Sequence, residues 1–560
     1  MDKSDLDSGS GSDSETRKEP NIDESVEDTV DDLMDDDSDG DFEEEDDDEM
    51  VESESDGDNN PMSNWLGITP ASIRKEVLKL HEDRKLKAKK FLKDFQGKLT
   101  LSYEWMLLGS SGGYTRGPDK HEDFTSLTAH FIDDSWKVRR WILGYTTGAS
   151  IPLDDVYVYH FRTAVQSFEI GRKVSSILLP NDEDFDEKTV DAIKKCMGEG
   201  PVFVVYCCAD LFRLMVDDLC SGFRWSLYEE LRMLVGWGRC SSLNWNVKLY
   251  HFQLAVDLKK EDAFSKDEVY DRYDKPSDEE WVKIETFCKL GGFVYKVAKE
   301  LFEEGGYSTS NVYFHLLAEL KVMLKKEVDG GESGEYFVGK AKEMLKMFDK
   351  YWNGMFLVLA SACVLDPRFN MKYVEFYCSK KIDSDEGSNA ETVLDYLRSL
   401  YARYAASDIC QKPICSAGTI DREEEDDEDE DCGDDEEEEE EKVKEEKPDA
   451  YKDFVLFQEF LKFEASPRVF AESELDAYLK EPIIEWNKDF KALEWWKEKS
   501  QTYPVLSRVA RDILSIPISR ATSYDAYASD KREPPESVLS MDAKAANAVM
   551  CSRSWLPLVK

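Results

Sequence analysis

The sequence has no apolar stretch long enough to cross a membrane, and its cysteines lack the spacing of a metal or disulfide framework. The longest apolar run is Met355–Leu365, well short of the ~20 residues that a membrane-spanning helix needs. The first residues are acidic and polar, so we expect no secretory leader and no membrane partner. The 12 cysteines include no C-x-x-C pair, which favours free thiols in a reducing compartment.

Motifs for two large enzyme classes are also missing. Neither G-x-x-x-x-G-K-[ST], typical of nucleotide hydrolysis, nor H-E-x-x-H, typical of zinc peptidases, occurs. The chain has only 6 histidines, and they are scattered. We therefore expect no metal and no cofactor.

Basic residues are outnumbered, 72 against 120 acidic ones, for a net charge of -48. Residues 1–60 hold 28 acidic and 3 basic residues (-25), and Asp421–Lys447 hold 20 and 4 (-16). These two runs carry -41 of the -48, which leaves -7 for the other 473 of the 560 residues. The repulsion of nucleic acid thus resides in two segments rather than in the body of the protein.

The two acidic segments have the composition of disordered chain. Residues 1–62 contain one aromatic residue, Phe42, among dense Asp, Glu, Ser and Gly. Such a segment buries too little apolar surface to offset the entropy of ordering. We predict a disordered acidic tail over 1–62 and a disordered acidic linker over 406–449.

A basic segment, residues 63–95, follows the acidic tail. From Ile73 to Phe95, nine lysines and arginines are interspersed with apolar residues, which predicts a helix. One interpretation is a solvated helix that packs its apolar residues on the body. The other is a helix that contacts phosphate or the acidic tail. The candidate phosphate contacts are Lys85, Lys87, Lys89 and Lys90.

After residue 95 the spacing of the apolar residues changes to the pattern typical of β-strands. The pattern predicts three strands in a meander, a helix and two buried parallel strands, and hence an α/β fold with a mixed sheet over residues 96–245. The strands are expected at 98–105, 126–132, 136–145, 175–179 and 201–207, and the helix at 161–171.

Helical spacing dominates the remainder of the chain. Apolar residues recur every three or four positions over 246–405, as in Trp281, Ile284, Phe287 and Leu290. This spacing predicts an all-α block. Residues 450–560 resume with helical patterns rich in Trp, Tyr and Leu.

The C-terminal residues carry a specific resemblance. Ser473–Leu479 (SELDAYL), Ala492–Lys497 (ALEWWK) and Tyr503–Ser519 (YPVLSRVARDILSIPIS) closely resemble the C-terminal dimerisation region of hAT-superfamily transposases, especially domesticated plant proteins of the DAYSLEEPER and RICESLEEPER type. Further matches at Leu127–Lys137 and Leu365–Lys372 keep the family's order. The resemblance covers residues 96 to 556.

The resemblance implies an RNase H-like core that starts at 96–245, is interrupted by the α-helical insertion 246–405 and is completed by 450–560. It also implies a nuclear homodimer that acts in DNA binding or in transcription or chromatin regulation. Six apolar residues are either intramolecular core or, as the family implies, part of the subunit interface. These residues are Leu475, Tyr478, Leu479, Trp495, Trp496 and Leu506.

Active transposases that resemble this chain hold two Mg²⁺ ions with three carboxylates. By the resemblance, the first carboxylate position is Tyr103, or Ser102 if the alignment slips by one residue. The second is Asp182 and the third is Tyr524. Glu104 and Asp525 are adjacent acids, but neighbouring residues point in different directions. We therefore expect the core to be catalytically inactive.

Two other family features depart from the pattern. The family has a C-x-x-H motif, whereas this sequence reads Cys207-Cys208-Ala209-Asp210, so Asp210 occupies the position of the family's histidine. Related proteins carry a BED zinc finger made from cysteines and histidines, whereas the first cysteine here is Cys196, so we expect no such finger. The alternative function is an acidic scaffold that binds histones or other basic proteins and does not itself bind DNA.

Overall fold

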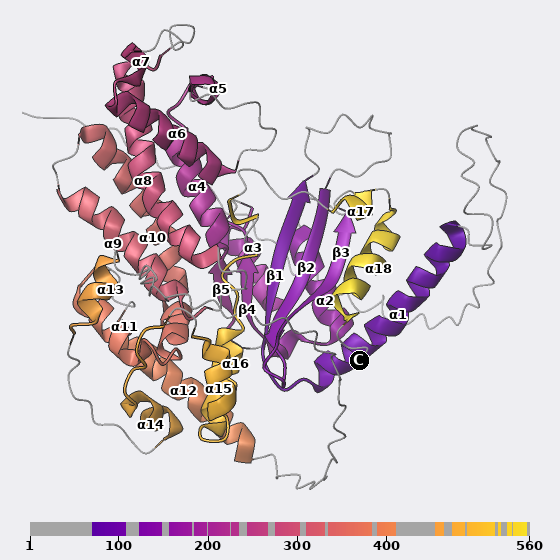
Figure 1. Ribbon diagram of the computed structural model, residues 1–560. Helices are drawn as coiled ribbons and strands as arrows, with labels where there is room; N and C mark the ends of the chain where they lie inside the picture. The colour runs from indigo at the N-terminus through magenta and orange to yellow at the C-terminus, as the bar shows by residue number, and fades with distance from the viewer. Residues whose placement is uncertain are drawn as a thin grey trace, which may run out of the picture. The chain divides into compact units, whose positions relative to one another are not determined.

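The computed structural model describes most of the chain between Pro70 and Leu556 (Figure 1). The described residues are 70–107, 123–147, 156–181, 184–198, 200–224, 226–234, 244–266, 275–302, 310–330, 334–382, 389–409, 454–463, 473–487, 490–520, 525–527, 535–539 and 541–556. All of them belong to one compact unit, Ile68–Lys560. The predicted acidic tail lies outside the described residues.

A five-stranded mixed sheet forms the centre of one half of this unit. Its strands are β1 (Leu99–Leu107), β2 (Asp123–Ile132), β3 (Val138–Thr147), β4 (Val174–Leu179) and β5 (Phe203–Tyr206), in the order β3-β2-β1-β4-β5. The β1–β2 and β2–β3 pairs are antiparallel, whereas β1–β4 and β4–β5 are parallel. The predicted meander followed by two parallel strands is confirmed.

Four of the described helices cover the sheet, and two of them come from the two ends of the described chain. They are α1 (Pro70–Asp94), α2 (Val156–Phe168), α3 (Glu187–Lys195) and α18 (Ala543–Ser554). In Figure 1, α18 lies along β3 and α1 lies beside α18, although more than 400 residues separate them. Ala88 and Leu92 of α1 are buried, whereas Ile73 is 53% exposed. The C-terminal half of α1 therefore packs on the body, as one of the two interpretations expects.

The second half of the unit is helical and adjoins the β5 edge of the sheet (Figure 1). The described residues of the predicted all-α block, 246–405, are largely helical, but two helices of this half, within residues 208–234, precede that block. It contains α4 (Cys208–Cys220), α5 (Leu227–Leu234), α6 (Trp245–Lys260), α7 (Ala263–Lys266), α8 (Asp278–Phe302), α9 (Tyr313–Gly330), α10 (Glu335–Val364), α11 (Asn370–Ser379) and α12 (Ala390–Ile409). The periodic residues Trp281, Ile284, Phe287 and Leu290 are all buried. The predicted linker start at 406 is wrong, because α12 continues to Ile409. Residues 410–449 of that linker lie outside the described residues.

The C-terminal segment contacts both halves. It forms α13 (Val455–Phe460), α14 (Glu474–Lys480), α15 (Ala492–Lys499), α16 (Pro504–Leu514), the 3₁₀ turn Asp525–Tyr527, α17 (Glu536–Leu539) and α18. Two of these helices begin at side-chain caps, because Ser473 accepts a hydrogen bond from the Asp476 amide and Asp542 accepts two from the first turn of α18. α16 packs on α10 and α12, whereas α18 packs on β3.

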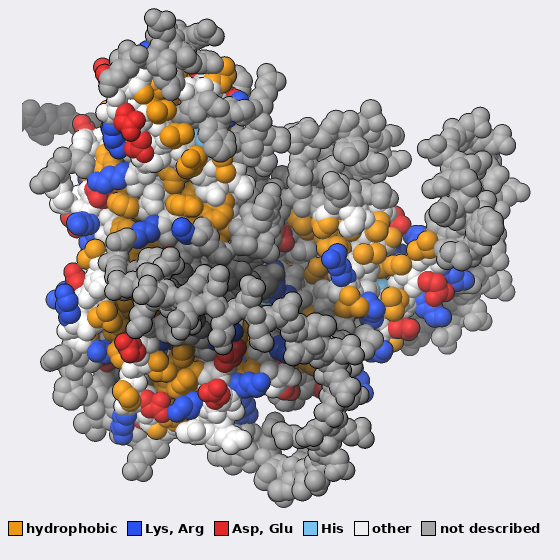
Figure 2. All heavy atoms as spheres, viewed as in Figure 1, with side chains coloured by type: hydrophobic (Ala, Val, Ile, Leu, Met, Phe, Trp, Pro, Cys, Tyr) orange, Lys and Arg blue, Asp and Glu red, His pale blue; other side chains and the backbone are white. Residues whose placement is uncertain are grey.

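Acidic and basic side chains are interspersed on the face shown in Figure 2, as expected for a body whose net charge is small. The eight cysteines of the described residues are all free thiols. None of the described helices combines the length and the apolar character that a membrane span requires.

Candidate functional site

The carboxyl ends of the parallel strands β1 and β5 bring together segments that are far apart in the sequence. Cys207 follows β5 and leads into α4, and the residues after α16 run past it. The Cys208 amide donates a hydrogen bond of 2.8 Å to the Ile518 carbonyl, and Cys207 Sγ lies 3.6 Å from Ser519 Oγ. These contacts place residue 520 beside the first turn of α4.

Arg520 connects β1 to α4 at this point. Its Nη2 donates a hydrogen bond of 2.7 Å to Asp210 Oδ2, and its Nη1 donates one of 2.9 Å to the Tyr103 carbonyl. The two charged side chains are only 11% and 21% exposed. Burial alone would raise the pKa of Asp210, but the charges of Arg520 and Arg213 outweigh it and lower that pKa. Asp210 is therefore an anion at neutral pH, and its charge is matched by Arg520.

Tyr103, the residue at the first carboxylate position, is fully buried in an aromatic cluster. Its ring centroid lies 5.4 Å from that of Tyr157, 6.0 Å from that of Phe161 and 5.8 Å from that of Phe185. Burial raises the pKa of Tyr103 well above its ordinary value, so the phenol stays neutral. In this chain the position supports packing between β1 and α2.

Ser102, the alternative first position, is occupied by another contact. Its Oγ lies 2.7 Å from Nε2 of His130 on β2, and both residues are buried. Burial and the charge of Arg140 hold the pKa of His130 well below its usual range, so the ring is neutral. A hydroxyl engaged in this way does not replace a metal-binding carboxylate.

The other predicted positions are described only in part. Asp182 and Tyr524 lie outside the described residues, and so does the side chain of Asp525. Glu104 is partly exposed, and its charge helps to raise the pKa of Arg520. Across the residues that the structure describes, no group of three or more His, Cys, Asp or Glu side chains could hold a metal ion. At the first carboxylate position the described residues, Tyr103 or Ser102, supply no carboxylate for a two-magnesium centre.

Four of the six residues in the predicted interface belong to the core of a single subunit. Leu475, Tyr478, Trp496 and Leu506 are fully buried. The Tyr478 hydroxyl donates to the Val364 carbonyl at 2.8 Å, and Trp496 Nε1 donates to the Leu365 carbonyl at 2.7 Å. For these four residues the structure supports the intramolecular alternative.

The remaining two residues, Leu479 and Trp495, are partly exposed. Four further apolar residues with the same partial exposure occur between and beside them, and the sequence pattern did not single these out. We call the set the α14–α15 apolar surface, and its members are Leu479, Ile483, Trp486, Phe490, Leu493 and Trp495.

The candidate lysines of α1 differ in their surroundings. Lys89 Nζ lies 2.8 Å from Glu169 Oε1, so its charge is already paired. Lys85 is half-buried, whereas Lys87 and Lys90 are exposed. Of the four candidates, Lys87 and Lys90 are therefore the most accessible to a phosphate.

Sequence comparisons place these features in a family. The model of the hAT family C-terminal dimerisation region matches residues 474–556, and that of the hAT-like transposase RNase-H fold matches residues 311–404. The second match runs from just before α9 into α12 and does not include the sheet.

Curated relatives match over a longer part of the chain. Zinc finger BED domain-containing protein RICESLEEPER 1 of Oryza sativa is 27% identical over 470 residues, which cover 77% of this chain and 63% of that protein. The DAYSLEEPER protein of Arabidopsis thaliana is 26% identical over 467 residues, covering 77% and 61%. A putative AC transposase of Zea mays is 23% identical over 525 residues, covering 87% and 60%.

The chain thus spans less than two thirds of the length of these relatives. The matched dimerisation region includes the C-terminal helices described above. The chain belongs to the hAT transposase family and is distantly related to the RICESLEEPER and DAYSLEEPER BED-zinc-finger proteins and to the Ac transposases.

Proposed function

We propose that this chain is a catalytically inactive, transposase-derived protein that forms homodimers and acts in the nucleus, in DNA binding or in the regulation of transcription or chromatin. One observation carries the proposal of inactivity: at the first carboxylate position Tyr103 packs in an aromatic cluster, and Arg520 binds its carbonyl. A guanidinium is permanently charged, so it repels a metal cation brought close to it.

The fold that we propose is an RNase H-like core with a helical insertion. The chain leaves the sheet after β5 and α4, forms the helical block that ends with α12, and returns with α16. After its return, Asp512 accepts a hydrogen bond from the Lys98 amide at 2.9 Å, and Arg520 binds the Tyr103 carbonyl. Both contacts join the C-terminal segment to β1, as expected if this segment completes the core.

A DNA strand-transfer assay with Mg²⁺ or Mn²⁺ tests the proposed inactivity. We expect no metal-dependent cleavage or joining by the purified protein, alongside an active hAT transposase as positive control. The matched variant is Asp182→Asn, which removes the acid at the second carboxylate position. Metal-dependent cleavage that this substitution abolishes would contradict the proposal.

The proposed homodimer uses the α14–α15 apolar surface. This surface lies within the matched dimerisation region, and its two tryptophans and one phenylalanine are of the type that anchors protein interfaces. The four buried residues support the surface from within. Sedimentation at several protein concentrations tests the proposal, and a protein that stays monomeric up to high micromolar concentration would contradict it.

We further propose that the exposed lysines of α1 contact DNA. Lys87 and Lys90 are exposed on a helix next to the sheet. The alternative function, an acidic scaffold that binds basic proteins, is favoured by the -25 charge of residues 1–60.

Binding of duplex DNA at low salt distinguishes the two functions. Binding by a chain that starts at residue 63 supports the DNA-binding function, and lack of binding supports the acidic scaffold.

A further inference from the structure

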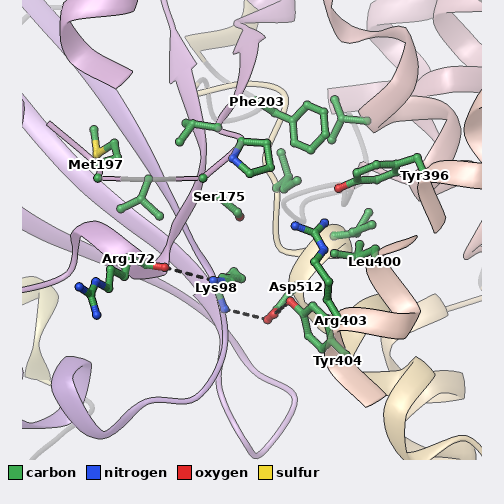
Figure 3. A pocket seen from close by; sticks show the side chains of 18 of the residues that line it. Lys98, Arg172, Ser175, Met197, Phe203, Tyr396, Leu400, Arg403, Tyr404 and Asp512 are labelled. Carbon is green, nitrogen blue, oxygen red and sulfur yellow. Dashed lines mark hydrogen bonds between the residues drawn. The ribbon is translucent and has the colours of Figure 1, made fainter. Parts of the chain in front are cut away.

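A cavity of about 210 Å³ lies at the opposite end of the sheet from Tyr103 and Cys207. Lys98, Ser175 and Phe203, at the starts of β1, β4 and β5, line one side of it. Helices α10, α12 and α16 line the other side (Figure 3). The cavity is therefore separate from the degenerate catalytic position and does not depend on the function proposed above.

Two cationic side chains face this cavity. Figure 3 shows Arg403 extending from α12 toward the sheet, with Lys98 on the opposite wall, whereas the Arg172 side chain points away. Lys98 Nζ donates a hydrogen bond of 3.1 Å to the Arg172 carbonyl. Within the described part of the chain, neither Lys98 nor Arg403 lies in an ion pair, unlike Arg520 with Asp210. Because like charges repel, two unpaired cations around one cavity favour a bound anion.

The acid in the cavity wall is hydrogen-bonded to groups other than the Lys98 ammonium and the Arg403 guanidinium. Asp512 is buried, its Oδ1 accepts the Lys98 amide at 2.9 Å, and its Oδ2 accepts the Tyr404 hydroxyl. Burial raises the pKa of Asp512. The hydrogen bonds from Tyr404 and the Lys98 amide, and the charges of Arg511 and Lys98, only partly oppose this effect. The carboxyl thus holds α16 to β1 and α12, and the charge of Arg403 stays available.

The turn before β5 leaves backbone open beside the cavity. Gly198 and Gly200 both line it and have φ angles of +88° and +151°, conformations that favour glycine. A Cβ placed on either residue would meet no atom within 4 Å. Glycine is therefore favoured at these two positions by the backbone φ angle and not by the lack of room for a side chain. Because no other atoms fill the space beside the two glycines, a ligand can approach the backbone closely there.

The size and lining of the cavity define the ligand class. Pockets for drug-sized ligands are typically ~300–1,000 Å³, so this cavity suits one compact group. An arginine fork and a lysine charge are complementary to a phosphate, and the Ser175 hydroxyl adds a donor. Phe203 and Tyr396, whose ring centroids are 5.4 Å apart, form an aromatic wall that suits a sugar or base. We propose that this cavity binds a phosphate monoester, as carried by a nucleotide or by the end of a nucleic-acid strand.

Calorimetric titration of the full chain at low salt tests this proposal. The probes are inorganic phosphate, AMP, and a short single-stranded oligonucleotide with and without a 5′-phosphate. Arg403→Gln is the test variant. Arg162→Gln on α2 is the matched control, because Arg162 is exposed, carries the same charge and does not line the cavity. Loss of a charge-assisted contact should weaken the tightest-binding probe about tenfold in Arg403→Gln, and by less than about twofold in the control.

The outcomes of this experiment either test the proposed phosphate site or identify the molecule that supplies the phosphate. Binding of phosphate and AMP that Arg403→Gln weakens supports a free nucleotide. Preference for the phosphorylated oligonucleotide over both the unphosphorylated one and AMP supports a strand end. Absence of binding by every probe, or equal binding by the two variants, would overturn the proposal. Lys98→Gln is an independent second variant, and unchanged thermal unfolding of each variant verifies that the fold is intact.

Discussion

Arg520 and Asp210 form a largely buried ion pair with an N–O distance of 2.7 Å, although 310 residues separate them in the sequence. Asp210 lies in the first turn of α4, before the main helical block, and Arg520 follows α16, after it. The same guanidinium binds the Tyr103 carbonyl on β1. The pair therefore closes the contact between the two segments that flank the helical block.

Removal of one partner of this pair should destabilise the fold. Arg520→Gln leaves the Asp210 carboxylate partly desolvated without its counter-charge, and we expect a loss of about 2–4 kcal/mol in the free energy of unfolding. Chemical denaturation at neutral pH measures it. The double variant Arg520→Gln/Asp210→Asn should recover part of the loss. Lys491→Gln, in a pair exposed by 70% and 68%, is the control and should change little. A single variant as stable as the parent would contradict this role.

The adjacent residues Trp495 and Trp496 should give opposite results. Trp496→Ala removes a fully buried indole and its hydrogen bond to Leu365, so we expect about 3–5 kcal/mol of lost stability. Trp495→Ala truncates a partly exposed ring and should cost much less stability while weakening self-association at least tenfold. Denaturation and sedimentation equilibrium measure the two effects. Unchanged self-association in Trp495→Ala would exclude this residue from the interface.

These tryptophans also show how far the sequence could predict the structure. Strand alternation and helical spacing are local patterns, so the order of strands and the all-α block followed from them. The burial of Trp496 relative to Trp495 depends on which side of α15 faces α16 and the residue that follows α10. Neighbouring helical residues differ by about 100° in direction. The sequence motif around both tryptophans therefore predicts that the segment contributes to dimerisation, but it does not show which tryptophan is buried in the core and which lies at the surface.

Long-range partners were the other feature that local patterns did not reveal. Arg520 directly follows the conspicuous Ile516-Pro-Ile-Ser519 text, yet only the folded chain brings it to Asp210. The cavity around Lys98 and Arg403 is assembled from the strand starts and three helices, so no contiguous motif marks it. The end of α12 was placed too early because polar residues such as Ser407 extend it, and the Ser407 hydroxyl donates to the Arg403 carbonyl.

A buried carboxyl on α9 should make stability depend on pH. Glu319 is fully buried, and its Oε1 accepts a hydrogen bond of 2.7 Å from the Phe457 amide at the start of α13. Burial raises the pKa of Glu319 to about 7, although the amides of Phe457 and Leu456 and the charge of Lys296 oppose the shift. The folded state thus holds a proton that the unfolded state has already released.

The contribution of Glu319 to stability is therefore complete below its unfolded pKa of about 4.3 and falls as the pH rises toward about 7, above which it levels off. Glu319→Gln, which cannot titrate, should lose this decline. We expect the stability of the parent relative to the variant to fall by about 2–3 kcal/mol between pH 5 and pH 8, measured by denaturation. A constant difference across this range would show that the carboxyl does not titrate as described.

The exposed lysines of α1 should contribute to DNA binding through phosphate contacts. Each contact releases about one counterion, so the double substitution Lys87→Gln/Lys90→Gln should reduce the slope of log affinity against log salt by about 2. Fluorescence anisotropy with duplex DNA and a chain that starts at residue 63 measures this slope, because the acidic tail is then absent. Lys342→Gln/Lys346→Gln on α10 is the matched control, since both lysines are exposed on a helix distant in sequence from α1. Equal slopes for the two double variants would exclude α1 as the DNA contact, and loss of binding in both would indicate only a diffuse dependence on charge.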